Sequence, residues 1–215
     1  MNHVEHQHQR RALALVCSVI GIVAIVVQMF VSIEYSFGLG RTLPLALNIY
    51  FSYFTTIINT VVAVSLMSLS LFPNSKISNW LRRSSVSAAI CLYIMIVGII
   101  FYALLVNTWV PKGIEIFATH TMHAVVPIMF FYLWLTRYRN SDLKYSDVPK
   151  WLGVPLGYFI YLMIRGQIIH IYPYFFVNVD KYGFGMVMVF AVAILVFFAI
   201  LGAVLVTIDR RFPKK

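Results

Sequence analysis

Hydroxyl, imidazole and guanidinium groups occur inside long apolar runs of this sequence. Thr55 and Thr56 lie in one run, His120 and His123 in another, and Arg165 in a third. A threonine hydroxyl becomes a nucleophile when a neutral histidine beside it takes its proton. A buried cation can stabilise an oxyanion that develops during the reaction. These are the residue types that nucleophilic catalysis inside a membrane would use.

The spacing of the polar residues predicts that each run carries them on one helical stripe. The stripes are Ser52, Thr55, Thr56 and Asn59; Thr119, His120 and His123; and Tyr158, Tyr161 and Arg165, followed by Gln167 and His170. At the helical rise of 1.5 Å per residue, Thr55, His123 and Arg165 lie about 8 to 10 Å below the outer ends of their helices. The sequence therefore predicts one polar site in the outer half of a membrane.

Each stripe also has a structural interpretation. Serine and threonine hydroxyls often join membrane helices or bond to the carbonyl four residues earlier. An intramembrane arginine is harder to explain in this way, because its insertion costs several kcal/mol unless a partner or water compensates. The three stripes at one depth favour a functional site.

The composition defines the setting in which these residues must act. Of the 215 residues 61% are apolar and 11% are charged, against roughly 25% charged in an average soluble domain. A soluble fold of this size would expose aggregating apolar patches, whereas a bilayer accepts them. A soluble enzyme and a disordered chain are excluded. The net charge of +10 does not indicate nucleic-acid binding, because the basic residues form short clusters between apolar runs.

Six apolar segments are long enough to cross a bilayer as helices, for which about 20 residues are needed. Their approximate bounds are 13–33, 49–72, 86–106, 116–136, 152–171 and 184–208. The first is too long for a signal peptide. Transmembrane strands would alternate apolar and polar residues, which these segments do not. We expect an all-α polytopic membrane protein, with a six-transmembrane-helix bundle forming one domain over residues 13–208 between tails 1–12 and 209–215.

The basic residues predict the orientation of this bundle. Thirteen Lys and Arg residues fall on one side of the six segments and three on the other. The positive-inside rule then places both termini in the cytoplasm. We expect a multi-pass integral membrane protein. The N-terminal His3, His6 and His8 are expected to be a solvated tail, and no metal site is predicted.

Short motifs in three spans resemble those of a known group of membrane proteins. His120-Thr121-Met122-His123, with Pro127 after it, resembles the fourth-span motif of the androgen-induced membrane hydrolases. Tyr53-Phe54-Thr55-Thr56, with Asn59 behind it, resembles their threonine motif in the second span. A bacterial six-span family related to them is more similar still. Its motifs recur in this order as Phe51 to Thr55, His123 to Pro127, Arg165-Gly166 and Tyr172-Pro173-Tyr174.

The resemblance implies hydrolysis of fatty acid esters of hydroxy fatty acids within the membrane, by a threonine nucleophile with a histidine base. By position the nucleophile is Thr55, with Thr56 as the alternative, and the base is His123. The residues expected to support the site, as oxyanion donors or substrate contacts, are Asn59, His120, Tyr161, Arg165 and His170. The expected partners are membrane lipids and a lipid ester substrate, without a cofactor or nucleic acid. The resemblance to the bacterial family implies a bacterial inner membrane as the location.

Three other functions compete with a hydrolase. His120, His123 and His170 could supply imidazoles to a haem or metal, although only His170 could face the fourth span. Arg165 could form the anion site of a transporter, but the sequence predicts neither an internal repeat nor a broken helix. A structural or assembly role without catalysis is also compatible with the composition.

Overall fold

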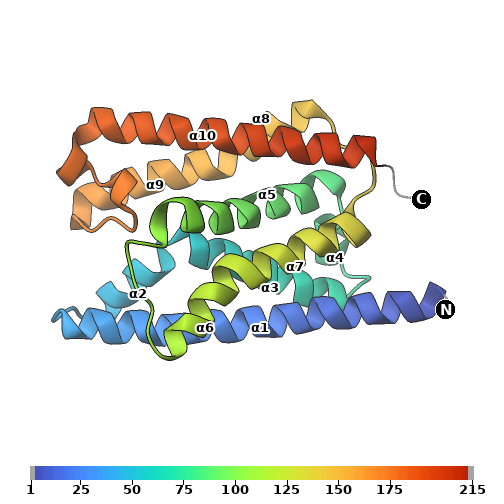
Figure 1. Cartoon of the computed structure of the whole chain (residues 1–215), viewed down its shortest axis with the longest axis horizontal. Coiled ribbons are helices and arrows are strands. Elements are labelled where there is room, and N and C mark those ends of the chain that lie inside the picture. The colour runs from blue at the N-terminus through green and yellow to red at the C-terminus, as the bar shows by residue number, and fades with distance from the viewer. Residues whose placement is uncertain (1–2, 213–215) are drawn as a thin grey trace. The chain divides into compact units, whose positions relative to one another are not determined.

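The structure is a computed structural model that describes residues 3–212, and the side chains of residues 1–8 and 10 are outside its described part. The chain is 83% helical, with no strand among the described residues. Six of the described helices are long and apolar enough to cross a membrane. The predicted all-α six-helix class is therefore confirmed, and the chain is a multi-pass membrane protein (Figure 1). The prediction for His3, His6 and His8 concerns side chains outside the described part of the chain.

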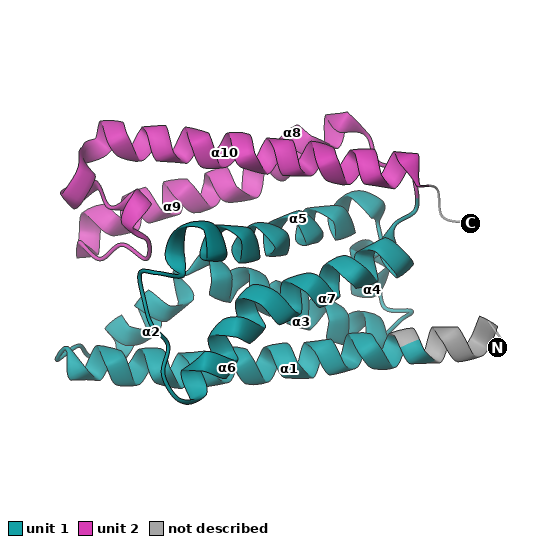
Figure 2. Cartoon of the chain, in the orientation of Figure 1, with its two compact units in different colours: residues 1–140, 214 teal, residues 141–213, 215 magenta. Residues whose placement is uncertain are grey.

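The chain forms two compact units, residues 1–140 and residues 141–213 (Figure 2). The first unit carries four of the candidate spans and the second carries two. Each unit is compact by itself, so the single domain expected over residues 13–208 stays a prediction.

The first unit is built from long helices that are interrupted at several points. Its elements are α1 (His3–Gly38), α2 (Leu43–Phe51), α3 (Phe54–Leu71), α4 (Lys76–Leu81), α5 (Ser84–Ile100), η1 (Phe101–Leu105), α6 (Ile114–His120), η2 (Thr121–Val125), α7 (Val126–Leu133) and η3 (Trp134–Tyr138). Helix α3 packs against α1 and α5, and α7 packs against α5. The Ser18 hydroxyl donates to the Ala63 carbonyl at 2.7 Å and joins α1 to α3.

The predicted continuous span 49–72 is wrong, because the chain breaks between α2 and α3. The Ser52 hydroxyl bonds to the carbonyls of Asn48 and Ile49, which competes with the helical pattern. Tyr53 is extended, with φ −72° and ψ 129°, and α3 begins one residue later. Ser52 therefore ends one helix, whereas Thr55 is the second residue of the next. The expected absence of a broken helix is also wrong.

The helices of the fourth span contain two π-helical turns, η2 and η3, and a third, η1, follows α5. In η2 the amide of Val126 donates to the carbonyl of Thr121, five residues earlier. Pro127 explains this change of register, because it has no N–H and its ring clashes with the carbonyl four residues before it. Such π turns are rare and often occur at functional sites.

The second unit is a pair of long helices with short turns before and between them. Its elements are η4 (Tyr145–Asp147), α8 (Val148–Trp151), α9 (Gly153–Ile169), η5 (Phe175–Val177) and α10 (Val179–Arg211). Helix α10 has a kink at Gly183, where φ is 74°. The buried Asp209 carboxylate accepts the amides of Ser141 and Leu143, both at 3.0 Å. This contact joins the start of the unit to the end of α10.

Candidate functional site

Thr55 and His123 meet in the first unit, from elements 68 residues apart in sequence. The Thr55 Oγ1 atom lies 3.5 Å from the His123 Nε2 atom. Thr55 belongs to the first turn of α3, and His123 is the central residue of η2. Both side chains are half-buried. The pair is thus protected from bulk solvent on one side and reachable on the other.

Two contacts hold the His123 ring in this orientation. Its Nδ1 atom lies 2.8 Å from the Thr119 carbonyl, which can only accept a hydrogen bond. The Nδ1 atom therefore carries the proton, and the lone pair of Nε2 points to the Thr55 hydroxyl. The Phe101 ring stacks on the imidazole, with the ring centroids 3.8 Å apart and the planes 21° apart. This is the tautomer that a general base needs.

The neighbouring Thr56 faces a different environment. Its side chain is buried and interacts with the Tyr50 hydroxyl of α2. That hydroxyl in turn donates to the Ile25 carbonyl at 2.6 Å. The contact to a histidine thus distinguishes Thr55 from Thr56.

Asn59 lies one turn after Thr55 and is 1% exposed. Its Nδ2 atom donates to the carbonyl of Thr55 at 2.9 Å and to that of Met122 at 3.2 Å. Since an amide nitrogen has two hydrogens, both are directed to backbone carbonyls. Asn59 therefore joins α3 to η2. Its amide has no further hydrogen to donate to an oxyanion.

His120 and Glu115 lie on the same span as His123 and have other partners. His120 is exposed, and its Nδ1 atom lies 2.9 Å from the Tyr102 hydroxyl. The buried Glu115 carboxylate accepts the Trp109 indole N–H at 2.8 Å and fixes the loop before α6. The group that orients His123 is consequently a backbone carbonyl and not this carboxylate.

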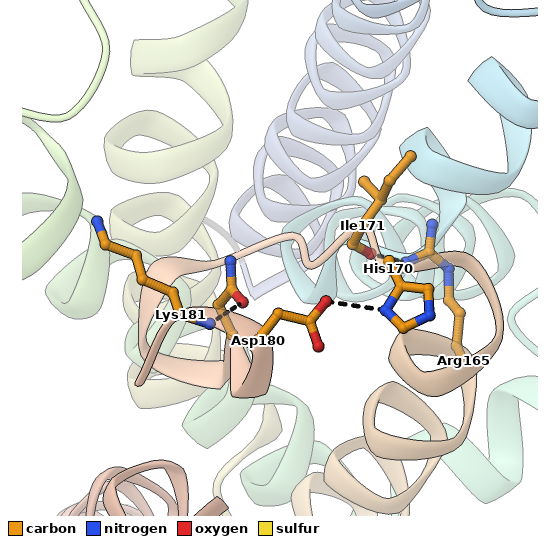
Figure 3. A network of polar contacts seen from close by, with 6 residues as sticks. Arg165, His170, Ile171, Asp180 and Lys181 are labelled. Carbon is orange, nitrogen blue, oxygen red and sulfur yellow. Dashed lines mark hydrogen bonds and ion pairs between the residues drawn. The ribbon is translucent and has the colours of Figure 1, made fainter. Parts of the chain in front are cut away.

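Arg165 and His170 lie in the second unit, around the turn that follows α9 (Figure 3). Arg165 is buried, and its Nη1 atom donates to the Ile171 carbonyl at 2.5 Å. His170 ends α9 in the left-handed conformation, and its Nδ1 atom lies 2.9 Å from the Asp180 carboxylate. This network stabilises the turn between α9 and α10. The oxyanion role expected for Arg165 stays a prediction.

The Arg-Gly and Tyr-Pro-Tyr motifs meet at the same turn. A Cβ atom added to Gly166 would lie 2.0 Å from the Tyr172 ring, so only glycine permits this approach. Burial and the nearby Asp180 carboxylate raise the pKa of the Tyr172 phenol. Tyr161, one turn before Arg165, is 42% exposed, and its nearest ring partner is Tyr158 at 6.3 Å. The Arg-Gly and Tyr-Pro-Tyr motifs therefore pack against each other at the C-terminal end of α9.

Sequence reasoning missed Phe101 and the Thr119 carbonyl. Phe101 is one of 17 phenylalanines, and nothing in its neighbourhood distinguishes it. A backbone carbonyl has no residue-specific pattern. The one available indication was Pro127, four residues after His123, because a proline at this spacing disturbs the carbonyl of the histidine.

Within the described part of the chain, no three His, Cys, Asp or Glu side chains could together hold a metal ion. No family model, curated protein or solved structure matches the chain. The contact between Thr55 and His123 is therefore the main evidence for a function.

Proposed function

We propose that this protein is an intramembrane lipid ester hydrolase in which Thr55 is the nucleophile and His123 the general base. The observation that carries the proposal is the 3.5 Å contact between Thr55 Oγ1 and His123 Nε2, with Nδ1 bound to a carbonyl. A hydroxyl, a base and a group that orients the base are the components of nucleophilic catalysis. The resemblance adds the substrate class, which is fatty acid esters of hydroxy fatty acids.

The first half of the reaction transfers the acyl group to Thr55. His123 Nε2 takes the hydroxyl proton while Oγ1 attacks the ester carbonyl carbon, forming a tetrahedral oxyanion. When this collapses, the bond from the carbonyl carbon to the alcohol oxygen breaks. The leaving oxygen receives the proton from His123, so the alcohol departs neutral and His123 is again a base.

Water completes the cycle. His123 takes a proton from the water, the hydroxide oxygen attacks the threonyl ester, and the bond to Oγ1 breaks. The proton returns to Oγ1, and the fatty acid is released. Thr55 lies at the N-terminal end of α3, whose helix dipole favours negative charge there in both halves.

A lipid substrate agrees with the surroundings of the pair. Large apolar side chains on the elements that carry the pair are exposed, among them Ile57 of α3 and Val125 of η2, and so is Phe51 at the end of α2. They are apolar surface that the acyl chains of a lipid can contact. The proposed setting is the outer half of a bacterial inner membrane, with both termini in the cytoplasm.

Labelling by a fluorophosphonate probe, together with hydrolysis of a long-chain fatty acid ester, tests the proposal. Wild-type protein should take up the probe and release fatty acid. Thr55→Ala should abolish both, whereas Thr56→Ala is the matched control and should retain both. Each variant must elute from size exclusion in detergent as wild type does. Well-folded wild type that takes up no probe and cleaves no ester would contradict the enzyme and favour a non-enzymatic membrane role.

Transport of a small molecule is the second candidate, because the break between α2 and α3 is a feature that transporters use for binding. Proteoliposomes with wild-type protein and proteoliposomes with Thr55→Ala would be compared. Equal uptake of a substrate by both would favour transport. In that case the hydroxyl would be dispensable for function.

A further inference from the structure

Pro127 removes one amide hydrogen from the helix that carries His123. In an α-helix the amide of residue 127 would donate to the carbonyl of His123, and in a π turn to that of Met122. The amide of Val126, which would serve the Met122 carbonyl in an α-helix, donates to Thr121 instead. The Met122 carbonyl thus has neither an α-helical nor a π-helical donor.

Asn59 supplies the donor that this carbonyl needs. Its Nδ2 atom lies 3.2 Å from the Met122 carbonyl and 2.9 Å from the Thr55 carbonyl. The Asn59 side chain is almost fully buried, and a buried carbonyl without a hydrogen-bond donor is destabilising. One amide therefore bridges the backbone at the threonine to the backbone beside the histidine.

Helix α5 approaches the same π turn from another side. A Cβ atom added to Gly98 would lie 2.6 Å from the His123 carbonyl oxygen. Real Cβ atoms do not come this close, so the turn and α5 pack together only because residue 98 is glycine. Phe101, three residues later, stacks on the imidazole. The π turn η2 is thus contacted by Gly98 of α5 and by Asn59 of α3.

We infer that Asn59 is a positioning residue that fixes the His123 ring against the Thr55 hydroxyl, through the carbonyl that Pro127 leaves without a helical donor. Its effect on rate rests on the proposed hydrolase function, whereas its effect on the histidine does not. Thr60 provides the contrast, because its hydroxyl bonds within α3 to the Thr56 carbonyl at 2.8 Å. Loss of the Thr60 hydroxyl leaves the link to η2 intact.

The first test is the Nε2 resonance of His123, measured by 15N NMR of full-length protein labelled at histidine, with the signal assigned by its loss in His123→Ala. In wild type, Thr60→Ala and Asn59→Ala alike, Nδ1 should keep its proton, because the Thr119 carbonyl accepts it within the same span. Thr60→Ala should leave the Nε2 resonance as in wild type, whereas Asn59→Ala should shift it, because the ring moves away from the Thr55 hydroxyl that faces Nε2. An unchanged Nε2 resonance in well-folded Asn59→Ala would overturn the inference.

The second test is kinetic and uses Pro127→Ala as well. Asn59→Ala should lower kcat by about 100-fold with little change in KM, as expected for a base displaced by about 1 Å. Pro127→Ala restores an amide and lets the turn become α-helical, which should also lower kcat and shift the Nε2 resonance of His123. The double variant should be no worse than the poorer single variant, because both changes act on one contact.

The outcomes separate the two proposals. If wild type hydrolyses esters and Asn59→Ala matches Thr60→Ala in kcat and in the Nε2 resonance, the positioning role is overturned. If wild type hydrolyses nothing while Asn59→Ala shifts the Nε2 resonance, the hydrolase proposal fails and the positioning of His123 stands. Additive effects of Asn59→Ala and Pro127→Ala would show that the two residues act on different contacts, which overturns the inference.

Discussion

The candidate site residues of the two units make contacts of different kinds. In the first unit, Thr55 contacts His123 across 68 residues of sequence, and Asn59 contacts Met122 across 63. In the second unit, Arg165 binds a carbonyl six residues later, and His170 contacts Asp180 ten residues later. The first arrangement joins separate helices, whereas the second closes a turn.

The difference shows that polarity inside an apolar segment is weak evidence for chemistry by itself. A side chain that binds its own neighbours is accounted for by local folding, as the Arg165 network is. Groups from distant helices need the whole unit to bring them together, and in the first unit a hydroxyl and an imidazole meet in this way. Substitutions should therefore impair catalysis in one region and stability in the other.

The largest expected effect is that of His123→Ala, which removes the proposed base. We expect kcat to fall by about 1,000-fold, within the usual contribution of general base catalysis. His120→Ala is the matched control on the same span, and its activity should stay near that of wild type because His120 contacts Tyr102. Steady-state kinetics in detergent measure both. Equal losses in the two variants would remove the distinction between these histidines.

Gly98→Ala should have the next largest effect. The added methyl group would meet the His123 carbonyl and push the π turn away from α5. A displacement of this kind should lower kcat by about tenfold or more, together with some loss of thermal stability. The kcat of the folded fraction is the deciding quantity. An unaffected kcat would mean that the position of η2 is not limiting for catalysis.

Gly166→Ala is the corresponding change in the second unit and should act on stability alone. The methyl group would collide with the Tyr172 ring, and overpacking of this kind costs about 1–3 kcal/mol. The melting temperature in detergent should fall, while the kcat of folded protein should not. Gly157→Ala, on the same helix with open space around it, should leave the melting temperature unchanged or raise it. A lower kcat in folded Gly166→Ala would place the Arg-Gly motif in the catalytic region.

The smallest expected effect is that of Asp180→Asn, which removes the carboxylate that contacts His170. Their side chains are 44% and 66% exposed, so the pair should contribute less than about 1 kcal/mol. The change in melting temperature should be slight and should shrink further at high salt. A large loss of stability would mean that the turn after α9 depends on this contact more than its exposure suggests.

The sequence was sufficient for the fold class because span length and apolarity are properties of composition. Each of the six predicted segments overlaps one of the six observed spans, but the second is broken after Phe51, α10 begins at Val179 and α1 extends to Gly38. The break was not predictable from apolarity, since apolar residues continue on both sides of it. The break depends on the hydrogen bonds that the Ser52 hydroxyl donates to backbone carbonyls.

Sequence spacing also indicated Thr55 and His123, because helical depth can be calculated from residue number. It could not separate Thr55 from Thr56, since adjacent residues differ in direction and not in depth. It could not assign Asn59 either. The partner of Asn59 is the Met122 carbonyl. Whether a carbonyl in a helix lacks a backbone donor depends on the helix register, which Pro127 alters here.

The most direct measurement of the central claim is the site of acylation. Wild-type protein is mixed with a p-nitrophenyl ester of a long-chain fatty acid, quenched with acid during the burst, digested and sequenced by tandem mass spectrometry. The account predicts an acyl group on Thr55, absent from Thr55→Ala and strongly reduced in His123→Ala. An acyl group on Thr56 or on another residue, or ester turnover without any acylated residue, would contradict it.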